Sequence, residues 1–470
     1  MKDFLAIINK IRILLMSKKA ILETISLVIF FVFVLAIRIW NIGNIPSVVN
    51  GDEMGSIVHP YQIIAGKLSL FQLTHDYSVP ALVYYPKAFL TLLLGINQGL
   101  VAARVVTVMF SLFALIVFYI IVRKEFGFIP SFFSTVLFSS SYWFLNFSRL
   151  SWTAVDNVFF GLLFYYFLIL SFKKGKWFFF VLSGVSASLV FMNYMGGRIY
   201  LLAGLILGLI FLFQKNNKQK IKLLIIIGVF LLTSLAFIKV IISDFDKYIL
   251  RAKSITVYNL NSNYYNLSPN NINGILFHQF KYSMEGFFFF NKEVSSEGIE
   301  NHRLLPLGKP AVNYFTVILF YVGLIFSVIR KKGLFFWLIY LFNIIILQVP
   351  SVYIPSWSRA IGILPAIYYF SALGIQEILV IGKKLIKNNR YLYILGFTIV
   401  VLVFAIGDLK TYWKWVVSDE FLSSQEPAIK ISELKDWQRC QYQEIIEGRS
   451  IFVAYDWKKD EFKRNLACFK

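Results

Sequence analysis

Asn50-Gly51-Asp52-Glu53 follows the first long apolar run of the chain and is its main candidate for a functional site. No Asp or Glu lies between Glu23 and Asp52, and the whole sequence has 47 Lys and Arg but only 25 Asp and Glu. In so basic a chain, two adjacent carboxylates beside a membrane-length run are either a solvated loop edge or the working groups of a site. We expect the pair in a loop that directly follows the first membrane helix.

The composition predicts a membrane protein built from helices. Of the 470 residues, 58% are hydrophobic and 15% are charged, whereas soluble domains carry roughly 25% charged residues. Long apolar runs recur along the sequence, each long enough to cross a bilayer core of roughly 30 Å as a helix. The sequence therefore predicts an all-α polytopic integral membrane protein. The net charge of +22 lies in short tracts between apolar runs, as in cytoplasmic loops, and does not indicate a nucleic-acid partner.

The basic tracts set the expected topology. Five of them fall on the cytoplasmic side if the short apolar segment 81–96 does not cross the membrane; the tracts are residues 123–127, 173–176, 215–222, 330–332 and 383–390. This arrangement gives about eleven crossings. We expect a transmembrane domain over residues 1–407, with large outer loops at about 40–98 and 243–311. Residues 408–470 are expected to form a small extracytoplasmic tail, helical around 431–447.

Motifs in a fixed order carry a family resemblance. They are Asn50-Gly51-Asp52-Glu53, Val83-Tyr84-Tyr85-Pro86-Lys87, Ala102-Ala103-Arg104-Val105, residues 123–127, Phe147-Ser148-Arg149 with Asp156, residues 306–310, and Ser358-Arg359-Ala360-Ile361-Gly362. With them the chain resembles the GT-C glycosyltransferases over residues 40–374, most of its length. Among these it is similar to the polyprenyl-phosphate-dependent transferases that include the protein O-mannosyltransferases and the lipid A aminoarabinose transferase.

The resemblance implies a GT-C fold and a reaction. The enzyme would move a hexosyl or pentosyl group from a polyprenyl-phosphate donor to an extracytoplasmic lipid, glycan or protein, by direct displacement. Asp52 matches the family's catalytic Asp and would act as general base. Glu53 either orients the site or is a solvated neighbour. Asp156 either faces a wet cavity, as a catalytic or acceptor-site residue, or caps a helix.

Basic residues near the expected outer face are candidates for holding the carrier phosphate, since Arg binds phosphate in a bidentate manner. Each arginine could instead be an anchor at the membrane interface, and a lone loop histidine such as His302 could simply be solvated. The candidates are Lys87, Arg149, Arg198, His302, Arg303 and Arg359. The acid pair with Asp156 could hold a divalent cation, but the resemblance implies no essential metal and no other cofactor.

Other functions remain open on the sequence alone. A lipid-linked glycan transporter or flippase would more often carry ionisable residues and broken helices at the bilayer midplane. A ligase or polymerase that uses diphosphate-linked glycans differs mainly in its donor. The predicted location is the prokaryotic plasma membrane, with the site on its extracytoplasmic face. Cys440 and Cys468 either form a disulfide there or are two separate thiols.

Overall fold

The computed structural model describes residues 18–74, 79–213, 217–260, 264–289, 304–352, 354–385, 389–425 and 428–448, with residues 455–456, 461–462 and 468. The chain divides into two compact units, residues 1–40 and residues 41–470. In the first unit the structure describes helix α2, Lys18–Ile39, which coincides with the first apolar run. Every other element belongs to the second unit.

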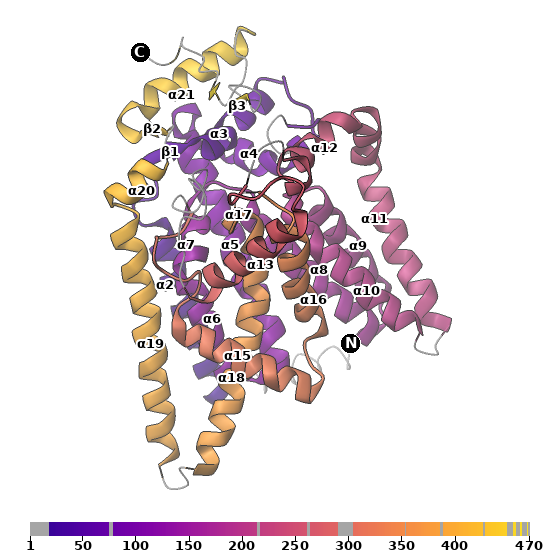
Figure 1. The fold of residues 1–470 in the computed structure, drawn as a ribbon, viewed down its shortest axis with the longest axis vertical. Helices are drawn as coiled ribbons and strands as arrows, with labels where there is room; N and C mark the ends of the chain where they lie inside the picture. Colours follow the sequence, from indigo (N-terminus) through magenta and orange to yellow (C-terminus); the bar gives the residue numbers. More distant parts are fainter. Residues whose placement is uncertain are drawn as a thin grey trace, which may run out of the picture. The chain divides into compact units, whose positions relative to one another are not determined.

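The N-terminal half of the second unit begins with a short strand and becomes helical (Figure 1). Its elements are β1 (Val48–Asn50), α3 (Gly51–Ile64), η1 (Ala81–Tyr84), α4 (Tyr85–Leu94), η2 (Ile96–Gln98), α5 (Gly99–Phe126), α6 (Phe128–Ser140), α7 (Tyr142–Arg149), α8 (Ala154–Lys174), α9 (Trp177–Phe191), η3 (Met195–Arg198), α10 (Ile199–Phe213) and α11 (Asn217–Ser243).

The C-terminal half continues with helices and ends in a small mixed tail. Its elements are α12 (Phe245–Ser254), η4 (Val257–Asn259), α13 (Ile272–Phe288), α15 (Tyr314–Arg330), α16 (Leu334–Phe342), the π-helical η5 (Asn343–Gln348), α17 (Trp357–Ala360), η6 (Ile361–Ile363), α18 (Leu364–Leu385), α19 (Arg390–Trp415), α20 (Asp419–Ser424), β2 (Ala428–Lys430), α21 (Ile431–Ile446), β3 (Tyr455–Asp456) and β4 (Glu461–Phe462).

The expected polytopic helical membrane protein is confirmed. Within the described residues, seven helices are long and apolar enough to cross a bilayer, namely α2, α5, α8, α10, α11, α18 and α19. The pair α6 and α7, bent by 60°, makes an eighth if it acts as one span. The expected eleven would be reached if α9, α15 and α16 with η5 also cross. The segment Ala81–Leu94, expected not to cross, is among the shorter apolar helices.

Two glycines allow the close packing of α15 and α18, which are extensively in contact. A Cβ added at Gly323 would collide with the carbonyl of Phe370, and one at Gly374 with the carbonyl of Leu319. Small residues let helix backbones approach in this way where lipid supplies no hydrophobic driving force between helices. Helix α5 packs against α4, α6 and α8. It therefore links the α3–α4 region to the middle of the transmembrane bundle.

The C-terminal tail packs on the start of the second unit. Strand β2 pairs antiparallel with β1, with Ile429 opposite Val49, and Figure 1 shows α21 lying beside α3. Trp437 of α21 is buried in a cluster with Val49 and Tyr61. Helix α21 matches the helical pattern expected around residues 431–447. Cys440 and Cys468 form a disulfide, which decides between the two expectations for these residues.

Candidate active site

The acid pair opens a helix. Asp52 and Glu53 lie in the first turn of α3, so the expectation that they occupy a loop was wrong. Asn50 is the N-cap, and its Oδ1 accepts a hydrogen bond from the backbone N–H of Glu53 at 3.0 Å. Such a cap satisfies one of the backbone donors left unpaired at a helix start. The positive end of the helix dipole also favours carboxylates at this position.

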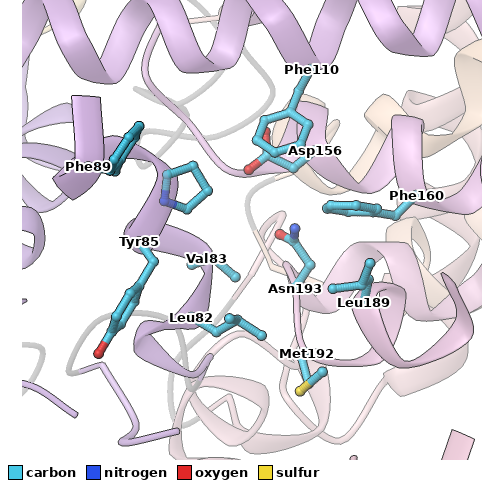
Figure 2. Close-up of a pocket in the computed structure, with 11 residues that line it drawn as sticks. Leu82, Val83, Tyr85, Phe89, Phe110, Asp156, Phe160, Leu189, Met192 and Asn193 are labelled. Atoms are coloured by element: carbon cyan, nitrogen blue, oxygen red, sulfur yellow. The ribbon is translucent and has the colours of Figure 1, made fainter. Parts of the chain in front are cut away.

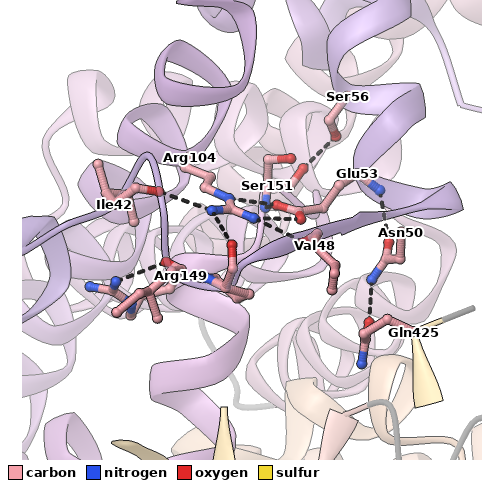
Figure 3. Close-up of polar contacts among 11 residues, drawn as sticks. Ile42, Val48, Asn50, Glu53, Ser56, Arg104, Arg149, Ser151 and Gln425 are labelled. Atoms are coloured by element: carbon pink, nitrogen blue, oxygen red, sulfur yellow. Dashed lines mark hydrogen bonds and ion pairs between the residues drawn. The ribbon is translucent and has the colours of Figure 1, made fainter. Parts of the chain in front are cut away.

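Glu53 is held by an arginine from α5. Arg104 Nε donates to Glu53 Oε1 at 3.0 Å and Arg104 Nη2 to Glu53 Oε2 at 2.9 Å, a bidentate pair (Figure 3). The backbone N–H of Ser151 donates to Oε1 at 2.9 Å. Glu53 and Arg104 are 1% and 0% exposed. A carboxylate so fully bonded suits positioning better than proton transfer, and this excludes the alternative of a solvated neighbour.

The other donors of Arg104 tie the chain before α3 to the same point. Nη1 donates to the carbonyls of Ile42 at 2.9 Å and Pro46 at 3.1 Å. Nη2 also approaches the carbonyl of Val48 at 3.4 Å. The guanidinium of Arg104 therefore holds both Glu53 and the backbone of residues 42–48, which precedes α3.

Lys87 from α4 reaches the same region and is fully buried. Its Nζ donates to the carbonyl of Ser151 at 2.7 Å and to Ser56 Oγ at 3.1 Å. Ser56 Oγ also donates to the carbonyl of Ser151. Burial lowers the pKa of Lys87 to about 8, while the carboxylates of Asp156 and Glu53 act to raise it. The structure thus brings together three predicted residues: Lys87, Glu53 and Asp156.

Asp156 lines a cavity of about 420 Å³ between η1–α4 and the helices α5, α8 and α9. The walls are almost entirely apolar, and Figure 2 shows Asp156 beside the aromatic rings of Phe110 and Phe160. The residue is 1% exposed, and within the described residues its Oδ1 makes no hydrogen bond. A buried carboxylate oxygen without a donor is costly unless a ligand or water meets it. The N-cap of α8 is Thr153, so the helix-cap alternative for Asp156 was wrong.

The start of α8 fits closely against η3. A Cβ added at Gly197 would collide with the side chain of Asn157, whose Nδ2 donates to the carbonyl of Tyr194. The residue beside the glycine, Arg198, lies over the rings of Phe191 and Tyr248, at 5.3 and 5.2 Å from the ring centroids. This close packing places the η3 turn next to the residues around Asp156.

Arg198 and Arg359 belong to one neighbourhood. Helix α17, which carries Arg359, contacts η3, and the carbonyl of Arg359 lies 3.2 Å from the position of a Cβ at Gly196. Arg198 Nε donates to the carbonyl of Phe191 at 3.3 Å, and Arg359 Nη1 to that of Val352 at 3.1 Å. Both guanidinium groups therefore have protein partners in this structure.

The remaining predicted cations lie elsewhere. Arg149 is at the end of α7, where Nη2 donates to the carbonyl of Ile45 at 2.9 Å and the guanidinium lies 4.6 Å from the ring centroid of Trp413 on α19. These contacts join the end of α7 to the segment before β1 and to α19. His302 and Arg303 lie outside the described residues.

Arg104, Ser56, Ser151 and Gln425 were absent from the predicted site. Asn50 Nδ2 donates to Gln425 Oε1 at 2.7 Å. Arg104 could have been found as a lone Arg inside a long apolar run, where a charge requires a partner. Asn50 and Glu53 also have the spacing of an N-cap and the N3 acid of a capping box. In the part of the chain that the structure describes, no three His, Cys, Asp or Glu side chains are placed to hold a metal ion.

The structure thus has a buried acid–base cluster beside an apolar cavity, on a scaffold of membrane-length helices. Residues 78–241 match the family model for dolichyl-phosphate-mannose-protein mannosyltransferases. No curated protein matches the sequence of this chain.

Solved structures resemble the fold. ArnT from Cupriavidus metallidurans in the apo state superimposes with a TM-score of 0.51 at 11% identity, over 90% of this chain and 76% of that chain. ArnT bound to undecaprenyl phosphate has a TM-score of 0.48 at 11% identity, over 90% and 78%. The Archaeoglobus fulgidus oligosaccharyltransferase in the apo form has 0.48 at 12% identity, over 94% and 60%. The first of these matches shows that the expected GT-C fold is present.

Proposed function

We propose that the protein transfers a sugar from a polyprenyl-phosphate donor to a hydroxyl group of an extracytoplasmic acceptor. The observation that carries this proposal is that Glu53 and Lys87 both bind the backbone of Ser151, while Asp156, whose charge acts on Lys87, lines an apolar cavity. The matched family model is named for a dolichyl-phosphate sugar, a donor of this chemical class. An isoprenoid chain needs apolar walls, and its phosphate needs a cation close to them.

In the proposed reaction Asp52 removes the proton from the acceptor hydroxyl as general base. The acceptor oxygen then attacks the anomeric carbon of the sugar. A new glycosidic bond forms as the bond from that carbon to the phosphate oxygen breaks, and polyprenyl phosphate leaves with the bonding electron pair. Protonated Lys87 would stabilise the charge on the leaving phosphate. Two of its three N–H groups donate to Ser56 and Ser151. The third could donate to the phosphate of the sugar donor.

The two other acids receive different roles. Glu53, paired with Arg104, would hold the first turn of α3 in position rather than exchange protons. Asp156 would meet a hydrogen-bond donor of the substrate with its Oδ1, because among the described residues that oxygen makes no hydrogen bond. Arg198 and Arg359 would contact the carrier phosphate from the η3 side.

The tail supports an extracytoplasmic site. Disulfides persist in oxidising compartments and are rare in the cytosol. Cys440 lies in α21, which packs on α3. The acid pair therefore lies on the same side of the membrane as the disulfide, which we assign to the extracytoplasmic side.

The test is Asp52→Asn in purified protein reconstituted into liposomes. The assay measures transfer of label from a panel of radiolabelled polyprenyl-phosphate sugars, with host membranes as the source of acceptor. Asparagine keeps the shape but cannot accept the proton, so transfer should fall by about 10²–10⁴-fold. Asp436→Asn, on the exposed side of α21, is the matched control. Near-normal transfer in Asp52→Asn would contradict the assignment of the base. Movement of the donor across the bilayer without transfer would favour a flippase.

A further inference from the structure

The C-terminal tail reaches the acid pair through a chain of side-chain contacts that ends at Gln425. Gln425 follows α20 and is 1% exposed, as is Asn50. Its Oε1 accepts from Asn50 Nδ2 at 2.7 Å, and Asn50 Oδ1 accepts from the backbone N–H of Glu53 at 3.0 Å (Figure 3). Two consecutive hydrogen bonds thus connect the tail to the first turn of α3.

The first of these bonds decides which way the Asn50 amide faces. An asparagine side chain has a donating and an accepting end, and it can turn about its last bond to exchange them. With the Gln425 oxygen on one side, the donating end is held there and the accepting end faces the helix. In the opposite orientation the Asn50 NH₂ would face the N–H of Glu53, two donors in contact. Gln425 therefore selects the orientation in which Asn50 caps α3.

The rest of the tail keeps Gln425 in reach. Three residues further on, β2 pairs with β1, the strand that ends at Asn50 itself. Trp437 and Leu434 of α21 pack with Val49 and Ile57. The strand pairing and the packing of α21 therefore both hold the backbone beside Asn50 and Gln425 in place.

We propose that Gln425 is a positioning residue of the catalytic centre, acting on Asp52 and Glu53 through the Asn50 cap. The tail is then a working part of the transferase rather than a separate cover. This inference rests on the proposed function, in which Asp52 is the base. A shift of a catalytic group by about 1 Å can cost about 10²-fold in rate, so a loosened first turn of α3 should lower turnover.

The decisive variants are Gln425→Met and Gln425→Glu. Methionine keeps the length of the side chain but lacks a strong acceptor, whereas glutamate retains an oxygen for Asn50 Nδ2. We expect kcat to fall about tenfold or more in Gln425→Met, with the KM for the donor unchanged within about twofold. Gln425→Glu keeps the acceptor but adds a buried charge, so its expected readout is not turnover but unchanged hydrogen exchange at the N–H of Glu53. Gln443→Met is the matched control, because Gln443 lies on the exposed side of α21.

Hydrogen exchange gives a readout that does not depend on activity. The N–H of Glu53 should exchange about fivefold faster in Gln425→Met, as expected when a typical hydrogen bond is weakened, and remain unchanged in Gln443→Met. In an Asn50→Ala background, Gln425→Met should have no additional effect on kcat, since both changes break one chain of contacts.

Three results would overturn the inference: normal kcat in Gln425→Met, a loss of kcat without faster exchange at Glu53, or additive effects in the double variant. A failure of the proposed function looks different. In that case the unmodified protein transfers no sugar from any donor, and exchange at Glu53 alone decides whether Gln425 orders the start of α3.

Discussion

Arg104 on α5 holds both carboxylate oxygens of Glu53 on α3, with Nε–Oε1 and Nη2–Oε2 distances of 3.0 and 2.9 Å. Removing one partner of a buried ion pair leaves an uncompensated charge, which typically costs about 3–5 kcal/mol. We expect Arg104→Ala to lower the free energy of unfolding by about this amount and to abolish transfer. Arg104→Lys should rescue little, because a lysine cannot form the bidentate pair. Thermal unfolding in detergent, together with the transfer assay, measures both effects.

The control for Arg104 is the ion pair of Arg330 and Glu377, which connects α15 and α18 with an Nη2–Oε1 distance of 2.6 Å. Arg330→Ala should destabilise the protein less, because the arginine is 37% exposed, and should leave kcat unchanged. If both arginine variants lose transfer in proportion to their stability, Arg104 contributes to folding alone.

Lys87 gives the site a pH dependence. Its pKa is lowered from the usual value of 10.5 to about 8 by burial. Between these two values the unfolded chain binds more protons than the folded one, so the contribution of Lys87 to stability rises with pH across this window. Donor binding moves in the opposite direction, because deprotonation removes the charge that would face the phosphate. The KM for the donor should rise as the pH passes about 8.

A pH titration of donor KM in Lys87→Met provides the check. This variant should bind the donor poorly at every pH and lose the rise above pH 8. If the variant retains the same pH profile as the unmodified protein, another group titrates in this range and Lys87 does not contact the phosphate.

Variants of Arg198 and Arg359 test whether these arginines bind the carrier phosphate or only hold the fold together. At a bidentate phosphate contact, Arg→Lys should harm donor affinity almost as much as Arg→Ala, because lysine lacks the planar fork. We expect apparent donor affinity to fall in each variant and acceptor affinity to change little. Arg439→Ala, on the exposed side of α21, serves as control. Intact donor binding in both alanine variants would leave the two arginines as anchors held by Phe191, Tyr248 and Val352.

The topology predicts which side of the membrane single cysteines face. Lys332, in the turn between α15 and α16, belongs to a basic tract and should face the cytoplasm. Gln443 on α21 should face outside. An impermeant thiol reagent added to intact cells should label Gln443→Cys and leave Lys332→Cys unmodified. Labelling of Lys332→Cys from outside would reverse the proposed orientation.

The helices could be predicted from the sequence because apolar runs of spanning length have few other stable states in a bilayer. The acids of the candidate site were conspicuous because acids are scarce in this chain. The partners of those acids were harder to find. Arg104 is 51 residues from Glu53 in the sequence. The sequence of an apolar helix does not show which acidic residue will pair with its single arginine. Ser151 binds Glu53 and Lys87 only through its backbone N–H and carbonyl. Any residue type can make such contacts, so the sequence does not reveal them.

The strand pairing of β1 and β2 has a consequence for the order in which the protein is made. Asn50 emerges from the ribosome early, but its partner Gln425 follows 375 residues later. Membrane helices are inserted as they are synthesised, so the transmembrane scaffold can assemble while α3 still lacks this partner. Contacts between such distant segments form late in folding, because the loop between them must first be closed. In the nascent chain Asn50 therefore precedes α3 without the partner that orients its amide, and a segment translated 375 residues later completes this contact.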